Sequence, residues 1–504
     1  METSLNSHFS LQPSESKTTR FPDWYSPETG IYSSKHSSVS LPTDCFLDIV
    51  SFIFSHQHDG VTALIDSSSG YSISYSKLLP LIQSMASGLH HLGVSQGDVV
   101  LLLLPNSVYF PIIFLSVLYL GAIVTAMNPL ASMLEIKKQI ADSGVRFAFT
   151  LLDKVDKLKN LGVHAIGVPE NLNLDSEKTD FLLFHKLIEG QFDKAPRPVI
   201  RQQDTAAIMN SSGLLSLGTS IVVMRRFNAT EMVNVIDKYG VTHFPVVPPI
   251  LTTLTMRAKG VRENSFKSLK QVSCGAASLT RKAIEDFVQA VPHVDFIQGY
   301  GMTESTAVGN RGFNNEKHHK YSSVGLLAPN MQAKVVDWNS GSSLPPGSYG
   351  ELWLRGPGIM QGYLNNVEAT RMTIDKDGWL RTGDIVCFDE DGYMYVSDRL
   401  KEIIKYKGYQ IAPADLEAIL ISHPEILDSA VIPAIDEVAG EIPVAFVVRR
   451  QGSTLTQGAV MDFVAKQVAP YKKVRKVVFT KSIPKSAAGK TLRRELRNFL
   501  SSRL

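Results

Sequence analysis

Short apolar runs that alternate with helical segments constrain the fold of this chain more than any other feature. Residues 99–103 are Val-Val-Leu-Leu-Leu, and residues 79–92 have the apolar spacing of a helix. Runs at 145–151 and 164–168 repeat the strand pattern. A continuous apolar run is typical of a strand that is buried on both faces of a parallel sheet. The alternation therefore predicts an α/β fold with a doubly wound sheet.

The same alternation continues to about residue 304, and the pattern then changes. Expected strands lie at 204–210, 221–224, 242–247 and 271–274, and expected helices at 230–239, from 250, and at 280–290. Further on, Gly and Asp turns separate antiparallel strands expected at 332–337, 349–355 and 384–395, which predicts a small β-barrel. The last 100 or so residues have the pattern of a compact α+β unit, a usual domain size.

These patterns divide the chain into three parts. Residues 1–44 are rich in Ser, Thr and Pro and predict a flexible arm, with Phe21, Trp24 and Tyr25 as its contacts with the body. Residues 45–398 form the expected N-terminal domain, and residues 399–504 the C-terminal α+β domain.

Charge and composition exclude several classes of partner. The formal net charge is +3, which gives no reason to expect nucleic acid or an anionic membrane as a partner. Residues 108–127 approach the length of a membrane span, but Pro111, Ser116 and Gly121 interrupt them, so a buried helix and strand are expected instead of a transmembrane span. The three cysteines are far apart without metal-ligand spacing, which indicates a reducing compartment.

A glycine-rich turn is the first candidate site. The sequence from Gln298 to Glu304 is Gln-Gly-Tyr-Gly-Met-Thr-Glu, and it follows a short expected strand at 294–297. Glycines at 299 and 301 let the backbone turn where a flat ligand binds, at the carboxyl edge of a sheet. Thr303 and Glu304 offer a hydroxyl and a carboxylate suited to a phosphate oxygen and to Mg²⁺. A purely structural turn explains the same residues.

Three later motifs add charged groups. Asp384 follows a tight turn and could accept hydrogen bonds from both hydroxyls of a ribose, or simply cap that turn. Lys405 and Lys407 would share one face of a strand and could meet an anionic ligand such as coenzyme A, although a solvated face is the common explanation. Lys490 lies on a loop of small residues before a helix, where it would stabilise charge on a phosphoryl group or form a basic surface loop.

Together and in this order, the four motifs resemble those of the adenylate-forming acyl-CoA synthetases, and among them the plant 4-coumarate:CoA ligase-like group. The resemblance extends from Trp24 to Arg494 and includes Leu-Pro-Asn-Ser at 104–107 and Gly-Ala-Ile-Val at 121–124. It implies a large N-terminal domain of two α/β sheets and a small barrel, followed by a mobile C-terminal domain. ATP, coenzyme A and Mg²⁺ are the implied cofactors.

The resemblance also implies roles for individual residues. It places Mg²⁺ at Glu304 and two ribose contacts at Asp384 and Arg399. It makes Lys490 the adenylation lysine and Lys401 the hinge of the C-terminal domain. The other implied nucleotide or coenzyme A contacts are Ala276, Gln298, Gly299, Thr303, Lys405, Lys407, Gly408, Gln410 and, less directly, Arg226.

The implied reaction has two halves. A carboxylate attacks the α-phosphate of ATP to give acyl-AMP and pyrophosphate, and Lys490 and Mg²⁺ offset the charge on the oxygens. The C-terminal domain then turns about Lys401, which removes Lys490 and presents Lys407, and coenzyme A thiolate displaces AMP.

The chain departs from the family after Ser211-Ser212-Gly213. Family members continue with Thr-Thr-Gly, a lysine and another glycine, which hold the β and γ phosphates, whereas Gly213 here passes directly to Leu214. Several dozen residues are absent in frame, and a skipped exon and a faulty gene model both explain this. Without that loop pyrophosphate loses its binding site, so we expect impaired adenylation and exposed strand edges.

Substrate, location and alternatives stay open. A hydroxycinnamate or a fatty or oxylipin-type acid fits, because residues 305–309 lack the Gly-Pro-Val-Leu run of the true 4-coumarate ligases. The terminal Ser-Arg-Leu at 502–504 predicts recognition by the peroxisomal import receptor, with the cytoplasm as the alternative. The rival hypotheses are a non-catalytic acyl- or nucleotide-binding splice form and an adenylating enzyme with another acceptor.

Overall fold

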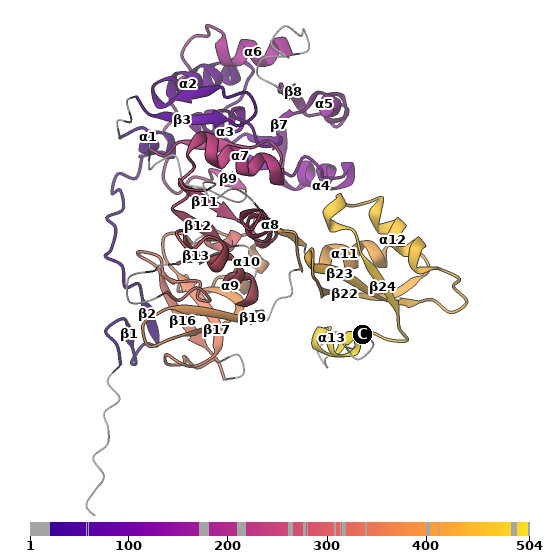
Figure 1. The fold of residues 1–504 in the computed structure, drawn as a ribbon. Helices are drawn as coiled ribbons and strands as arrows, with labels where there is room; N and C mark the ends of the chain where they lie inside the picture. The colour runs from indigo at the N-terminus through magenta and orange to yellow at the C-terminus, as the bar shows by residue number, and fades with distance from the viewer. Residues whose placement is uncertain are drawn as a thin grey trace, which may run out of the picture.

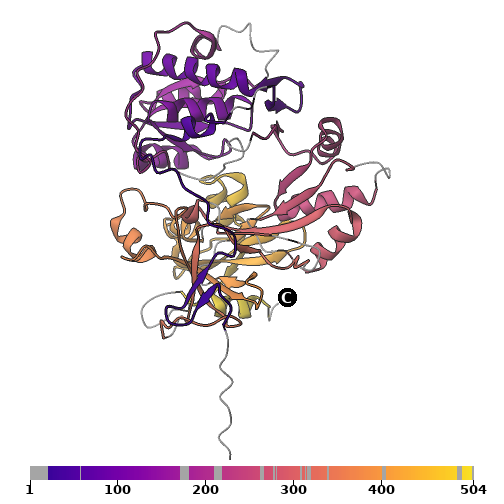
Figure 2. The same ribbon diagram turned by 90° about the vertical axis from the view of Figure 1, so that its left-hand side faces the viewer.

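The computed structural model describes most of the chain in two unequal parts, a large N-terminal body and a C-terminal unit that projects from it (Figure 1). The described residues are 21–56, 58, 60–170, 181–208, 218–260, 266–275, 279, 281–306, 309–312, 314, 319–337, 340–399, 404–411, 413–484 and 491–501. The upper lobe of the body holds the first sheet (Figure 2).

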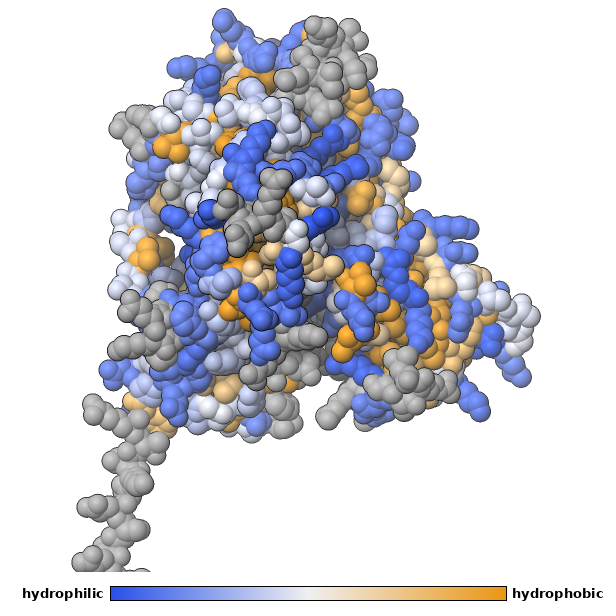
Figure 3. All heavy atoms as spheres, in the orientation of Figure 1, coloured by the Kyte–Doolittle hydropathy of each residue, from blue (hydrophilic) through white to orange (hydrophobic). Residues whose placement is uncertain are grey.

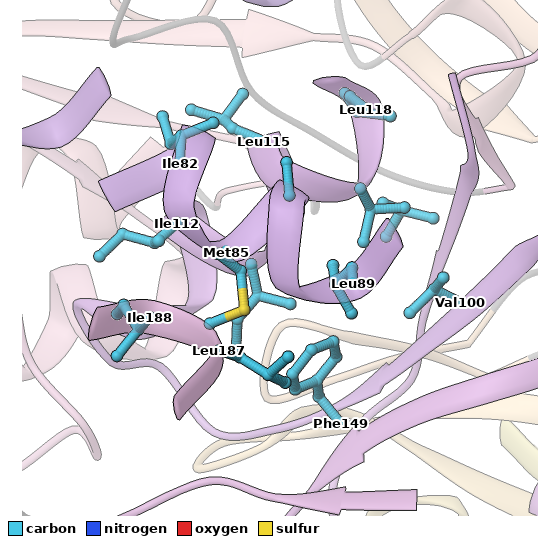
Figure 4. Close-up of a cluster of buried hydrophobic side chains, with 14 of the residues drawn as sticks. Ile82, Met85, Leu89, Val100, Ile112, Leu115, Leu118, Phe149, Leu187 and Ile188 are labelled. Atoms are coloured by element: carbon cyan, nitrogen blue, oxygen red, sulfur yellow. The ribbon is translucent and has the colours of Figure 1, made fainter. Parts of the chain in front are cut away.

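The first sheet is parallel and doubly wound, as the alternation predicts. Its five strands have the order β8-β7-β5-β6-β9, with α2, α3 and α6 on one face and α4 and α5 on the other. Figure 4 shows Met85 and Leu89 of α2 packed among side chains of α3, α6 and the sheet. The elements are α1 (Ile49–Ile53), α2 (Tyr75–His91), β5 (Val99–Leu103), α3 (Tyr109–Tyr119), β6 (Ile123–Ala126), α4 (Met133–Ser143), β7 (Val145–Thr150), α5 (Leu152–Lys159), β8 (His164–Gly167), α6 (Leu182–Glu189) and β9 (Ala207–Ile208).

A three-stranded sheet joins two segments that lie far apart in the chain. β3 (Thr62–Asp66) pairs antiparallel with β4 (Ser72–Ser74) and parallel with β10 (Ile221–Val223). All three residues of β10 are half-buried. A strand with both faces covered would be buried, so β10 is only partly covered.

The second α/β sheet combines parallel and antiparallel strands. β11 (His243–Val246), β12 (Gln271–Cys274) and β13 (Asp295–Tyr300) are parallel, and β14 (Asn310–Arg311) and β15 (Leu326–Leu327) follow antiparallel. Its core is formed with α7 (Ala229–Tyr239), α8 (Pro248–Ala258) and α9 (Arg281–Ala290). β13 continues to Tyr300 because β14 pairs with Gly299 and Tyr300, so the prediction that the backbone turns at Gly299 is wrong.

The antiparallel strands form one six-stranded sheet in the order β1-β2-β16-β17-β18-β19. Its elements are β1 (Tyr25–Ser26), β2 (Ile31–Ser33), β16 (Gln332–Val336), β17 (Gly350–Arg355), α10 (Val367–Thr373), β18 (Leu380–Phe388) and β19 (Met394–Arg399). Residues 25–33 of the expected flexible arm thus form a hairpin that joins this sheet. There Tyr32 is fully buried, and its ring centroid lies 4.7 Å from that of Phe388. The sheet stands in the place of the expected barrel, with β1 and β19 as its edges.

The C-terminal unit is an α+β sandwich around a five-stranded sheet. Its strands are β20 (Ile404–Tyr406), β21 (Tyr409–Ile411), β22 (Ile426–Asp436), β23 (Gly440–Arg449) and β24 (Lys476–Phe479), and its helices α11 (Pro413–Ile421), α12 (Gln457–Ala465) and α13 (Arg493–Ser501). Buried side chains of α11 and α12 pack on one face of the sheet, and Leu496 and Leu500 of α13 pack on the other.

The stretch at 108–127 forms the helix and strand expected of it, α3 and β6. Within the residues that the structure describes, none of the helices combines the length and the apolar character that a membrane crossing requires. Hydrophilic and hydrophobic side chains are interspersed over the face in Figure 3.

Candidate functional site

The carboxyl edge of β11, β12 and β13 forms the floor of the candidate site. These strands are parallel, so their ends lie at one edge of the sheet. Gly275 N donates to Val246 O at 3.3 Å, and a Cβ on Gly275 would lie 3.4 Å from Gly299 O. The backbones of the three strands therefore approach closely where a flat ligand would lie.

Tyr300 connects this edge to the six-stranded sheet. Its Oη donates a hydrogen bond of 2.6 Å to Asp384 Oδ2. Asp384 lies in β18 and is 1% exposed, and its backbone N donates to Thr382 Oγ1 at 3.1 Å. A buried carboxylate requires such donors. The hydrogen bond fixes Asp384 beside the end of β13.

Arg399 lies directly across the sheet from Asp384. The two residues are backbone partners in the β18–β19 pairing. The side chain of Arg399 lies outside the described residues, so only its backbone position is known. That both residues meet one ribose stays a prediction.

Glu304 lies in a single 3-10 turn, Thr303–Ser305, four residues after Tyr300. Tyr363 Oη donates to Glu304 Oε1 at 2.6 Å, and Met360 N donates to Glu304 O at 2.9 Å. Burial, and then the hydrogen bond to Glu304, raise the pKa of Tyr363 to about 12, so this phenol remains a donor at neutral pH. The segment before α10 thus holds the carboxylate in place, beside the exposed Thr303.

Gln298 is buried in β13, two residues before the strand ends, and it holds the segment around Tyr321 beside the site. Its Nε2 donates to Tyr321 O at 2.7 Å. The neighbouring Lys320 contacts Asp389 Oδ2 at 2.7 Å and Asp391 Oδ2 at 2.6 Å. Burial acts to lower the pKa of Lys320, but these two carboxylates outweigh it and hold the pKa above its ordinary value. An ion-pair cluster therefore anchors the segment that contacts Gln298.

The C-terminal unit reaches the site through the β20–β21 turn. A Cβ on Gly408 would lie 2.8 Å from Val247 Cγ2, so the turn packs against the residue after β11. Lys407 has a φ of 48° and lies in this turn, whereas Lys405 lies in β20 opposite Gln410, whose side chain is outside the described residues. The prediction that Lys405 and Lys407 share a strand face is wrong, because the strand ends at Tyr406.

Several predicted residues are not brought to this site. Arg226 is exposed beyond β10, and no contact among the described residues joins it to the others. The remaining predictions fall outside the described residues, and these are Ser211, Ser212, Gly213, Ala276, Lys401 and Lys490.

Two tyrosines have roles that the sequence analysis missed. Tyr300 is part of the glycine-rich motif, but nothing in the spacing shows that its hydroxyl reaches Asp384, 84 residues later. Tyr363 follows Gly362 in a loop, 59 residues after Glu304. Their partners lie far away in the sequence, so only the fold could identify these two tyrosines.

Comparison with known families gives two matches along the chain. A model described as AMP-binding enzyme matches residues 54–214 and again residues 204–364. A second, described as AMP-binding enzyme C-terminal domain, matches residues 415–490. The first match is thus in two pieces that overlap at residues 204–214.

The similar proteins include several plant CoA ligase-like proteins. 4-Coumarate–CoA ligase-like 6 of Arabidopsis thaliana is 56% identical over 539 aligned positions, which cover 95% of each chain. 4-Coumarate–CoA ligase-like 3 of Oryza sativa is 48% identical and covers 95% of this chain and 93% of its own. Peroxisomal OPC-8:0-CoA ligase 1 of Arabidopsis thaliana is 40% identical, covering 92% and 95%.

A solved structure supports the fold. The o-succinylbenzoate CoA synthetase of Bacillus subtilis, a double mutant with a bound product analogue, superposes with a TM-score of 0.75 at 22% identity. The match covers 87% of this chain and 95% of the synthetase.

Proposed function

Since this chain belongs to the AMP-binding enzyme family, among its 4-coumarate–CoA ligase-like acyl-CoA synthetases, we propose that it is an ATP-dependent carboxylic acid:CoA ligase with an impaired first half-reaction. The hydrogen bond from Tyr300 to Asp384 carries the proposal, because it joins the glycine-rich edge to a buried carboxylate opposite Arg399. Asp384 accepts from the ribose hydroxyls, and the glycines of the edge admit the adenine.

Glu304 is the proposed metal ligand, and its surroundings fit Mg²⁺. A nucleotide-bound Mg²⁺ needs only one or two protein carboxylates, besides phosphate oxygens and water. Tyr363 orients Glu304 Oε1, and Thr303 adds a hydroxyl nearby. When bound, Mg²⁺ neutralises charge on the phosphate oxygens.

In the proposed second half-reaction, coenzyme A thiolate attacks the acyl carbonyl of acyl-AMP. A carbon–sulfur bond forms, the bond from the acyl carbon to the phosphate oxygen breaks, and AMP leaves with both electrons. Lys407 and Lys405 supply positive charge near the anionic ligands. Lys490 serves the first half-reaction and Lys401 the rotation between the two, as the family resemblance implies.

We further propose that a phosphate-binding segment is missing after Gly213. Three observations support this. The AMP-binding match comes in two pieces that meet and overlap at residues 204–214, and the alignment with the Arabidopsis relative has 539 positions, more than the 504 residues of the chain. The strands that follow the junction are partly uncovered, because β10 is half-buried throughout and β11 has two exposed residues, His243 and Pro245. Loss of backbone donors to the phosphates weakens adenylation most.

Separate assays of the two half-reactions test the proposal. The purified chain should release pyrophosphate from ATP and acid about 10²-fold or more slowly than the Arabidopsis relative, since one lost oxyanion donor costs about 10²–10³ in rate. It should still convert pre-made acyl-AMP and coenzyme A to thioester. Insertion of the relative's intervening segment at the Gly213–Leu214 junction should restore pyrophosphate release. A normal rate in the unmodified chain would refute the impairment.

The proposed loss of a segment after Gly213 also favours the alternative that the chain is a non-catalytic acyl- or nucleotide-binding splice form. It predicts that an acyl-adenylate analogue binds while thioester formation from pre-made acyl-AMP is absent. An acceptor other than coenzyme A is the remaining alternative, and a scan of amines and thiols with pre-made acyl-AMP distinguishes it.

We propose that the substrate is a hydroxycinnamate or a fatty or oxylipin-type acid. We also propose that the protein is located in the peroxisome. One relative is named a peroxisomal OPC-8:0-CoA ligase, and the chain ends in Ser-Arg-Leu. A panel of acids offered to the restored chain tests the first point. A fluorescent reporter that carries the last residues tests the second, and a reporter that stays in the cytoplasm would refute it.

A further inference from the structure

The C-terminal unit is fastened to the N-terminal domain at the first turn of α4. Ser132 caps this helix and forms a capping box with Glu135. Two groups of the C-terminal unit join the box: Ser132 Oγ donates to Gln467 O at 2.8 Å, and Ala469 N donates to Glu135 Oε2 at 3.1 Å. A helix start in one domain therefore binds backbone groups of the other.

An ion pair lies at the centre of this contact. Lys472 Nζ is 2.9 Å from Glu135 Oε1, and the two side chains are 19% and 18% exposed. Burial acts to raise the pKa of Glu135, but hydrogen bonds from Lys472 and Ser132 outweigh it and hold the pKa below its ordinary value. Asp415 Oδ2, 3.5 Å from Lys472, adds a second carboxylate from the C-terminal unit itself. Removing one partner from a pair this far from water costs more than removing one from an exposed pair, because the other charge is left unpaired.

The fastened orientation brings a specific part of the C-terminal unit to the candidate site. The turn at Lys407 and Gly408 packs against Val247, at the carboxyl edge of β11. α13, which follows the Lys490 loop, packs on the sheet face opposite α12, and Figure 1 shows α12 below α4 and α13 on the far side of the unit. The orientation thus places the turn that carries Lys407 at the edge of the candidate site, where the proposed second half-reaction would use it.

We propose that Glu135 and Lys472 are positioning residues that hold the C-terminal unit in the orientation for acyl transfer to coenzyme A. This inference rests on the proposed function for its consequence, but the contact itself does not. Rotation to an adenylating orientation must break the pair, together with the two hydrogen bonds beside it. The pair therefore biases the equilibrium between the two orientations toward the second half-reaction.

Energy transfer between two dyes on the full chain measures the orientation directly. One dye is attached to the exposed Cys45 and the other to a cysteine introduced as Gln451→Cys, also exposed. Glu135→Gln retains an oxygen for the capping box and removes the charge, and Lys472→Met removes the ammonium at similar length. Lys466→Met, at the exposed end of α12, is the matched control for the loss of a lysine.

Each single substitution should move the orientation equilibrium about fivefold to tenfold away from the fastened state, as expected for a half-buried ion pair. The double variant should be no worse than the poorer single one, because both remove the same interaction. The control should not change the equilibrium. Unchanged energy transfer in both single variants, with circular dichroism confirming their fold, would overturn the inference.

A parallel assay separates this inference from the proposed function. Thioester formation from pre-made acyl-AMP should show a KM for coenzyme A raised about fivefold in both single variants, with kcat less affected. Changed energy transfer with unchanged thioester kinetics would establish the fastening and refute the role given to this orientation. Changed energy transfer with no thioester formation even in the parent chain would refute the proposed function alone.

Discussion

Substitution of Asp384 by Asn tests the candidate nucleotide site most directly. The change keeps the size of the side chain and one acceptor oxygen but removes the charge. Asp384 is 1% exposed and already accepts a hydrogen bond of 2.6 Å from Tyr300 Oη. An amide can accept that bond as well, so we expect the fold to persist.

The expected loss of affinity follows from the two ribose hydroxyls. A hydrogen bond to a charged acceptor contributes about 1.5–3 kcal/mol, against about 0.5–1.5 kcal/mol for a neutral one. Two such bonds weakened by about 1–1.5 kcal/mol each give a loss of about 2–3 kcal/mol, or roughly 30- to 150-fold in Kd. Tyr300→Phe leaves both carboxylate oxygens and only loosens their orientation, so we expect a loss of about fivefold, near 1 kcal/mol.

Calorimetry with a nonhydrolysable acyl-adenylate analogue measures these losses. Asp337→Asn is the matched control, because Asp337 follows β16 of the same sheet and its carboxylate accepts from Ser340 N at 2.8 Å within a turn. Wild-type affinity in Asp384→Asn, in a variant that melts within about 2 °C of the parent, would refute the ribose assignment. A larger loss in Tyr300→Phe than in Asp384→Asn would refute it too.

Three further predictions concern stability and reactivity. Lys320→Met should lower the stability of the N-terminal domain by about 2 kcal/mol, because two carboxylates lose their partner. For a domain of this size that is a fall of roughly 3 °C in melting temperature, and an unchanged melting curve would show that this cluster is not stabilising. Thiol titration of the native chain at about pH 8 should detect Cys45 quickly, and Cys274 and Cys387 only after unfolding. Cys274 and Cys387 are buried, and burial raises the pKa of Cys274 to about 12. Rapid reaction of more than one thiol would contradict the packing. Gly325→Ala should yield little folded protein in an expression and solubility test, because φ is 90° and a Cβ would lie 1.9 Å from a carbonyl oxygen of β14; normal yield would mean that this backbone can move.

The sequence predicts the elements whose own local pattern of residues shows how they are buried. Residues 99–103 form β5 because a continuous apolar run fits only a strand covered on both faces, and all five are buried. Residues 271–274 form β12 with the predicted bounds. The family resemblance predicts that Asp384 and Arg399 meet one ribose, and the structure makes them backbone partners in the β18–β19 pairing; their shared contact with a ribose stays a prediction.

The missed features depend on partners that are distant in the sequence. Gly299 continues a strand because β14 pairs with it, and the strand pattern before it cannot show this. The contacts of Tyr300 and Tyr363 span 84 and 59 residues. The turn at Lys407 could have been predicted, because a glycine after it with apolar residues on either side is typical of a two-residue hairpin loop.

The pairing of β2 with β16 has a consequence for how the protein is made. Tyr32 lies opposite Ala333, so the hairpin near the N-terminus cannot reach its neighbour until about 300 more residues have been synthesised. At about 5–20 residues per second this delay is roughly 15–60 s. Throughout it the ring of Tyr32 has no burial site and one side of β2 lacks its neighbour, a state that favours aggregation and chaperone binding. Expression of the chain without its first 33 residues would therefore remove β1 and β2 and leave the sheet without its own edge.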